Sequence, residues 1–183
     1  MTIFFIILAI ILVVALFIIS VYNNLVKSRQ KVKNAWSQID VQLQRRFDLI
    51  PNLVECVKGY MSHEADVLEK VSALRSSWAN AKTVDEKSNL DNQLSGVLKT
   101  IMAVSEKYPD LKANQNFSSL QSSLGETENK ISFARQFYND SVLTYNNKVE
   151  MVPSNIVANI TGFKKGTFFE AEEKDKEAPK VSF

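Results

Sequence analysis

The chain has 183 residues, with 22 basic and 20 acidic side chains and a net charge of +2 at pH 7. This near balance excludes the strong basic excess that is typical of nucleic-acid-binding domains. Cys56 is the one cysteine, so no intramolecular disulfide can form, and a thiolate metal site is not expected. Only 5 glycines and 4 prolines are present, which favours helices over a turn-rich β-sandwich or barrel.

The first segment is apolar from Ile3 to Ile19 and continues through Tyr22 without a charged side chain. A helix of about 20 apolar residues is long enough to cross the hydrocarbon core of a bilayer, which is ~30 Å thick. A cleaved signal peptide is the main alternative, but it would need a leading positive charge and a small-residue cleavage motif. We therefore expect residues 1–24 to hold a retained transmembrane anchor.

Four basic residues follow this segment before the first acid, Asp40; they form the juxtamembrane basic cluster, Lys27, Arg29, Lys31 and Lys33. The positive-inside rule then predicts the N-terminus outside and the rest of the chain in the cytoplasm of a cell membrane. Each cation near an anionic leaflet contributes about 1 kcal/mol of binding, so the cluster is also a candidate membrane-surface contact. A solvated helix face that only sets the topology is the alternative interpretation.

Two long stretches beyond the anchor carry apolar residues in alternating steps of three and four, from Val32 to Met61 and from Phe117 to Val149. This spacing predicts two long amphipathic helices. The first continues from the membrane segment, and Pro51 should kink or break it because proline cannot donate a backbone hydrogen bond. The second is expected from about Leu111 to Met151, where Pro153 stops it.

Two shorter helices are predicted between the long ones. The first begins at the N-cap candidate Ser62 and ends near Asn80. The second opens with Thr83 and Glu86, which have the spacing of a capping box, and closes at Tyr108-Pro109-Asp110.

These elements predict an all-α fold: an N-terminal transmembrane helix followed by an antiparallel, four-helix-type bundle with two long and two shorter helices. We expect the anchor in residues 1–24, the bundle in 25–153, a short helix and loop packed on it in 154–170, and a charged disordered tail in 171–183. The segment 154–170 contains Phe163, Phe168 and Phe169. We expect these phenylalanines to fold back and cap the bundle, and a contact with the membrane surface is the alternative.

The most distinctive polar patch lies where Pro51 disturbs the first long helix; its members are Arg45, Arg46, Asp48 and Asn52. Backbone groups freed by a proline need hydrogen-bond partners, and Asn52 or a crossing side chain such as Gln121 could supply them. A structural network is the favoured interpretation, and a partner-binding site is the alternative.

Catalytic chemistry has little support in the sequence. The pair His63-Glu64 suggests a zinc-protease helix, but that motif needs a second histidine at position 67, where valine stands. Nucleophilic catalysis would depend on the same single histidine, and the scattered glycines form no phosphate-binding loop. We therefore expect no enzyme activity, no cofactor and no metal.

Two runs of the sequence resemble the LemA family of bacterial membrane proteins. The first is AWSQIDVQLQRRFDLIPNLVECVKGYMSHEADVLEKVSALR, and the second is YPDLKANQNFSSLQSSLGETENKISFARQFYNDSVLTYN. Together they cover nearly all of the soluble part. The resemblance implies a membrane-anchored helical bundle with a cytoplasmic bulk, and it implies no catalytic residues.

The leading functional hypothesis is a non-enzymatic scaffold or adaptor that presents its bundle to another membrane protein. The resemblance adds a membrane metalloprotease as one such partner to test. The alternative is a membrane-surface or lipid-organising protein that uses the juxtamembrane basic cluster. The lipid bilayer is an expected partner in both cases, and nucleic acid in neither.

Overall fold

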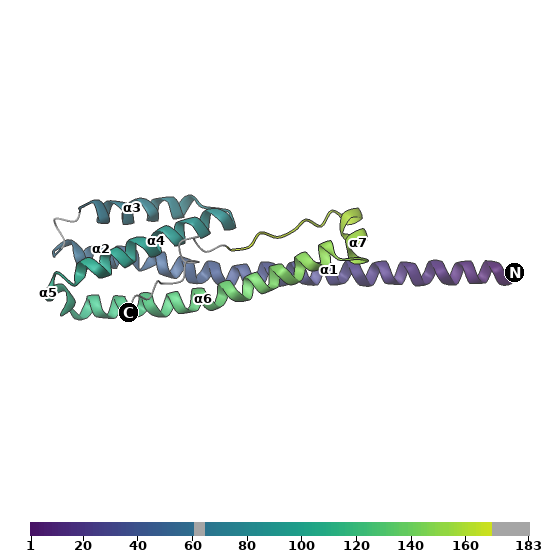
Figure 1. Ribbon diagram of the computed structural model, residues 1–183, viewed down its shortest axis with the longest axis horizontal. Coiled ribbons are helices and arrows are strands. Elements are labelled where there is room, and N and C mark those ends of the chain that lie inside the picture. Colours follow the sequence, from purple (N-terminus) through teal and green to yellow (C-terminus); the bar gives the residue numbers. More distant parts are fainter. Residues whose placement is uncertain (61–64, 170–183) are drawn as a thin grey trace, which may run out of the picture. The chain divides into compact units, whose positions relative to one another are not determined.

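The computed structural model describes residues 1–60 and 65–169, and every regular element within these ranges is a helix (Figure 1). The predicted all-α fold is confirmed. As predicted, it contains two long helices, which start at Thr2 and Gln115, and two shorter ones between them, which start at Ala65 and Val84. The described elements are α1 (Thr2–Asp48), α2 (Ile50–Lys58), α3 (Ala65–Asn80), α4 (Val84–Ser105), α5 (Pro109–Lys112), α6 (Gln115–Glu150) and α7 (Ser154–Thr161).

The chain forms two compact units. The first combines residues 1–38 with residues 136–168, and the second combines residues 39–135 with Phe169. Both α1 and α6 contribute residues to each unit. The charged tail predicted for 171–183 and the N-cap predicted at Ser62 lie outside the described residues.

In the first unit, α1 begins as an apolar helix whose side chains face outward. Its most apolar window has a mean hydropathy of 3.5 and is not buried at all against other residues. By length and composition it is the one candidate membrane span in the described part of the chain, as predicted.

Beyond the apolar run, α1 packs against α6 and α7 around a small core. Its buried members are Leu25, Tyr145, Val149, Val157, Ala158 and Phe163. After α7 the chain turns at Gly162, whose φ of 74° is left-handed and so suits glycine, and then runs extended beside α6.

Side chains of α6 bind the backbone of this extended segment. The Tyr145 hydroxyl donates to the Lys164 carbonyl at 2.7 Å. The Asn146 amide donates to the Gly166 carbonyl at 3.0 Å and accepts from the Gly166 N–H at 2.8 Å. Asn146 thus satisfies both backbone groups of Gly166, and burial of the Tyr145 ring raises the pKa of its hydroxyl.

In the second unit, α2, α3 and α4 enclose an apolar core with the adjoining parts of α1 and α6. Phe47 and Trp78 stack with ring centroids 4.2 Å apart, and the Trp78 indole N–H donates to the Gln44 side chain at 3.0 Å. Side chains with no exposed surface include Ile39, Leu43, Leu53, Val57, Val71, Leu94, Ile101 and Ile131.

The break predicted at Pro51 is confirmed. The first helix ends at Asp48, and α2 begins at Ile50, which places the proline in its first turn. A first-turn N–H has no intrahelical acceptor, so the missing donor costs little there.

The capping box predicted at Thr83 is also confirmed. Its hydroxyl accepts the Glu86 N–H at 3.1 Å, and the Glu86 carboxylate accepts the Thr83 N–H at 3.0 Å and the Lys82 N–H at 2.8 Å. These backbone donors lower the pKa of Glu86.

The predicted start of the last long helix, near Leu111, was wrong. That residue lies in the separate short helix α5, and α6 begins at Gln115. The Asn114 side chain accepts the N–H groups of Asn116 and Phe117, at 2.9 and 3.3 Å, and so caps the new helix.

Candidate functional site: a buried charge network and two surface hollows

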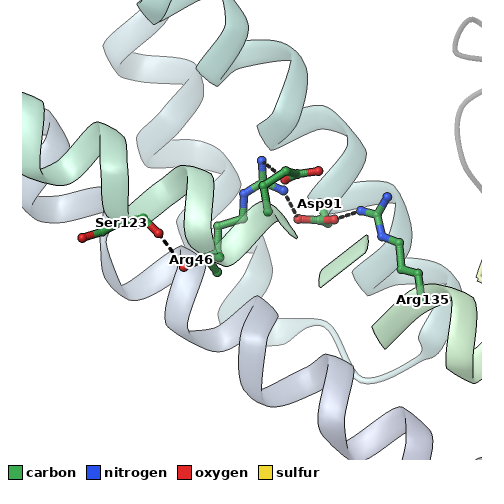
Figure 2. Close-up of polar contacts among 6 residues, drawn as sticks. Arg46, Asp91, Ser123 and Arg135 are labelled. Atoms are coloured by element: carbon green, nitrogen blue, oxygen red, sulfur yellow. Dashed lines mark hydrogen bonds and ion pairs between the residues drawn. The ribbon is translucent and has the colours of Figure 1, made fainter. Parts of the chain in front are cut away.

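Four charged side chains meet inside the second unit, contributed by α1, α4 and α6 (Figure 2). Arg46 Nη1 lies 2.7 Å from Asp91 Oδ1, and Arg46 Nη2 lies 2.8 Å from Glu128 Oε2. Arg135 pairs with the other oxygen of Asp91. A single carboxylate therefore holds two arginines that come from different helices.

The burial of this network is unequal. The Asp91 side chain is fully buried and that of Arg46 is 5% exposed, whereas those of Arg135 and Glu128 are 20% and 44% exposed. The two positive and two negative charges cancel, which offsets part of the desolvation that burial imposes. Because breaking such a pair leaves an uncompensated charge, the network fixes how α1, α4 and α6 face one another locally.

The sequence held a signal for this network that apolar periodicity alone misses. Asp91 stands three residues before Leu94, on the buried stripe of α4, and Arg135 stands four after the buried Ile131 of α6. Charged residues at core positions of two helices indicate a buried pair when their signs are opposite.

An open cleft of about 480 Å³ lies beside the network, between α4 and α6. Arg46, Glu128 and Arg135 line it together with Lys99 and Gln121. Its lining contains charged and amide groups without a histidine or cysteine, so it suits polar contacts with a ligand or protein segment. Within residues 1–60 and 65–169, no three His, Cys, Asp or Glu side chains gather as a metal ion would require.

The structure separates the residues of the patch predicted near Pro51. Only Arg46 enters the core, whereas Arg45, Asp48 and Asn52 are exposed. Asp48 accepts a hydrogen bond from Gln44 at 2.8 Å on its own helix. Asn52 lines a shallow hollow of about 640 Å³ together with Glu55 and Cys56 of α2, Tyr60 just after that helix, and Ser119 of α6.

In the same hollow, burial raises the pKa of the Cys56 thiol.

All four residues of the juxtamembrane basic cluster are exposed on α1. Two of them also contact aromatic rings: the Arg29 guanidinium lies 4.8 Å from the centroid of Phe163, and Lys31 Nζ lies 5.4 Å from that of Phe137. These contacts place both cations over ring faces within the first unit. Phe163 and Phe169 are buried, in line with the capping role, whereas Phe168 is 38% exposed.

A second hollow, the α3–α4 groove, has a volume of about 640 Å³. Apolar or small residues line it, among them Ala73, Leu74, Gly96 and Val97, and its rim carries exposed polar groups that include Lys70, Ser77, Gln93 and Thr100. An apolar lining with a polar rim suits the apolar face of an added helix.

The fold and these surfaces define a class: a helical-bundle protein with one candidate membrane helix at its N-terminal end. A family model described as the LemA family matches residues 35–183, which is most of the chain. The chain belongs to the LemA family.

Three relatives illustrate the range of similar proteins. Magnetosome protein MamQ 2 of Paramagnetospirillum magneticum is 27% identical over 175 residues, covering 81% of this chain and 64% of the relative. Protein LemA of Metamycoplasma hominis is 27% identical over 156 residues, covering 84% of this chain and 71% of the relative. Magnetosome protein MamQ of Magnetospirillum gryphiswaldense is 25% identical over 174 residues, covering 81% of this chain and 64% of the relative.

The chain thus spans less than two thirds of the length of the magnetosome proteins that it matches. Together with the apolar start of α1, these relatives support a membrane location.

Proposed function

We propose that the protein is a membrane-anchored adaptor that binds another protein through the α3–α4 groove. The groove carries this proposal, because its apolar lining and polar rim match the way an amphipathic helix is bound. The partner then offers an apolar helical face, and a membrane metalloprotease is one candidate to test. The positive-inside rule supports a cytoplasmic bundle and an external N-terminus.

Site-specific photo-crosslinking in the native membrane tests the adaptor role. A crosslinking amino acid is placed at Ser77 or Gln93 on the groove rim, and at the exposed Lys130 of α6 as a control. We expect one discrete protein adduct from both rim positions and none from the control. Filling the groove with Ala73→Trp should remove that adduct while the helix content is kept.

Adducts that are as frequent at Lys130 as at the rim, or that survive Ala73→Trp, contradict the adaptor proposal. Orientation is tested separately by protease treatment of intact cells and inverted vesicles. Cleavage of the soluble part only in inverted vesicles supports the cytoplasmic placement, and cleavage in intact cells overturns it.

The second candidate function is organisation of anionic lipids by the juxtamembrane basic cluster. The observation that favours it is the exposure of all four cations directly after the apolar run. In vesicles that contain the full-length protein, Lys27→Gln with Lys33→Gln should reduce energy transfer to a labelled phosphatidylglycerol. The same pair of changes made at Lys107 and Lys130, which are also exposed, should leave the transfer unchanged.

A further inference from the structure

One face of α7 and the turn before it expose apolar side chains to an unusual degree. Ile156 is 58% exposed and Ile160 is 80% exposed, and the preceding Met151 and Val152 are 62% and 77% exposed. The two isoleucines stand four residues apart, so they share one face of the helix. The other face is buried, because Val157 and Ala158 are 5% and 0% exposed.

The buried face fixes the level of α7 along α1. Val157 and Ala158 belong to the core that contains Leu25, and Val21 packs against the same core. Leu25 is six residues past the end of the apolar run at Ile19, which corresponds to about 9 Å along a helix. Figure 1 shows α1 continuing alone toward the N-terminus from the level of α7.

That level coincides with the headgroup layer when the apolar run fills the hydrocarbon core. The layer on each side of the core is about 5–8 Å thick, so a helix packed between Val21 and Leu25 lies within or beside it. Amphipathic helices bind this layer with their apolar face inserted to about 5–10 Å.

The charges near α7 suit an anionic membrane surface. Arg29 is held over the Phe163 ring, and the exposed Lys164 and Lys165 follow that ring in the chain. Lys165 pairs with Glu150, the one acid between Asn147 and Gly166. Cations beside an inserted apolar face are the pattern of interfacial helices.

We propose that α7 is a second membrane contact: an interfacial helix whose Met151, Val152, Ile156 and Ile160 side chains insert into the headgroup and upper acyl region beside the α1 span. The occupant of this apolar face is therefore lipid. The proposal needs the α1 span but does not depend on the adaptor function.

Quenching by brominated lipids tests the insertion in full-length protein reconstituted into vesicles of phosphatidylcholine and phosphatidylglycerol. In a Cys56→Ser background, single cysteines that replace Ile156 or Ile160 carry an environment-sensitive fluorophore. Leu12→Cys, within the apolar run, is the positive control for the span. Gln136→Cys, on an exposed site of α6 in the same unit, is the aqueous control.

We expect brominated lipid to quench the labels at positions 12, 156 and 160, and not the label at 136. Quenching at 12 but not at 156 and 160 overturns the proposal while leaving the span intact. Labels at 156 and 160 that are shielded from aqueous iodide without lipid quenching indicate a protein occupant, either a second copy or a partner, and also overturn it. Circular dichroism of each labelled variant confirms that it is folded.

Discussion

Arg46 and Asp91 form the most deeply buried ion pair described in the protein, with Nη1 and Oδ1 2.7 Å apart and side chains that are 5% and 0% exposed. The same carboxylate also holds Arg135. The loss of this one acid therefore affects two arginines from two helices.

Replacing Asp91 by alanine should destabilise the protein by about 3–5 kcal/mol, because the buried Arg46 would keep only the half-exposed Glu128 and Arg135 would lose the same carboxylate. Urea unfolding in detergent, followed by tryptophan fluorescence, measures the change. Asp140→Ala, at an exposed position of α6, is the matched control and should change stability by at most about 0.5 kcal/mol. A cost at position 91 as small as that of the control would show that the pair has no structural role.

At the start of α4, loss of the capping box should destabilise the protein less than loss of Asp91 does. Thr83→Ala removes the acceptor of the Glu86 N–H and should cost about 0.5–2 kcal/mol. Thr83→Ser retains a hydroxyl at the same place and should recover most of the loss. If serine is as damaging as alanine, the hydroxyl is not the stabilising group.

The pH dependence of the same cap follows from the lowered pKa of Glu86. Its stabilising contribution is present above the unfolded-state pKa, about 4.3, and is lost as the pH falls through the lower folded-state pKa. The gap in unfolding midpoint between the native protein and Glu86→Gln should therefore be largest near neutrality and should narrow below about pH 4. A gap that is constant between neutral and acid pH would contradict the ionic contribution.

Ile131 and Leu143 of α6 form a matched pair for testing the core. Ile131 has no exposed surface, whereas Leu143 is 51% exposed. Ile131→Ala should cost about 2–5 kcal/mol in denaturant unfolding, because it opens a cavity. Leu143→Ala should cost much less, and similar losses at both positions would mean that the stripe of α6 is not the one described.

Asn146 should hold the extended segment after α7. Asn146→Ala leaves the N–H and the carbonyl of the half-buried Gly166 without their side-chain partner, and each lost hydrogen bond should cost about 0.5–1.5 kcal/mol. Hydrogen exchange at Gly166 should become faster. Asn147→Ala, at the exposed neighbouring position, should leave this exchange unchanged.

Residue spacing predicted much of the fold because each signal is local. The break at Pro51 and the capping box at Thr83 depend on residues within about one turn of each other, and the apolar run from Ile3 to Ile19 is one continuous stretch of chain. The start of α6 was misplaced since the apolar stripe runs through Leu111 without showing that Asn114 caps a new helix.

The candidate site was less predictable. Arg46, one member of the patch expected near Pro51, enters a charge network, but its partners lie 45 and 82 residues further along the chain, at Asp91 and Glu128. No periodicity relates residues on different helices, so only packing could select these partners from the 20 acids of the chain.

Local sequence patterns predicted the helical class, the candidate span and several helix ends, because hydrophobic spacing, proline and capping residues act within a few residues of chain. Helix packing in three dimensions was needed to show that Asp91 is buried between two arginines and that Ile156 and Ile160 stay exposed beside the end of the apolar run. Both outcomes depend on which helix faces meet, and long-range contacts set those faces.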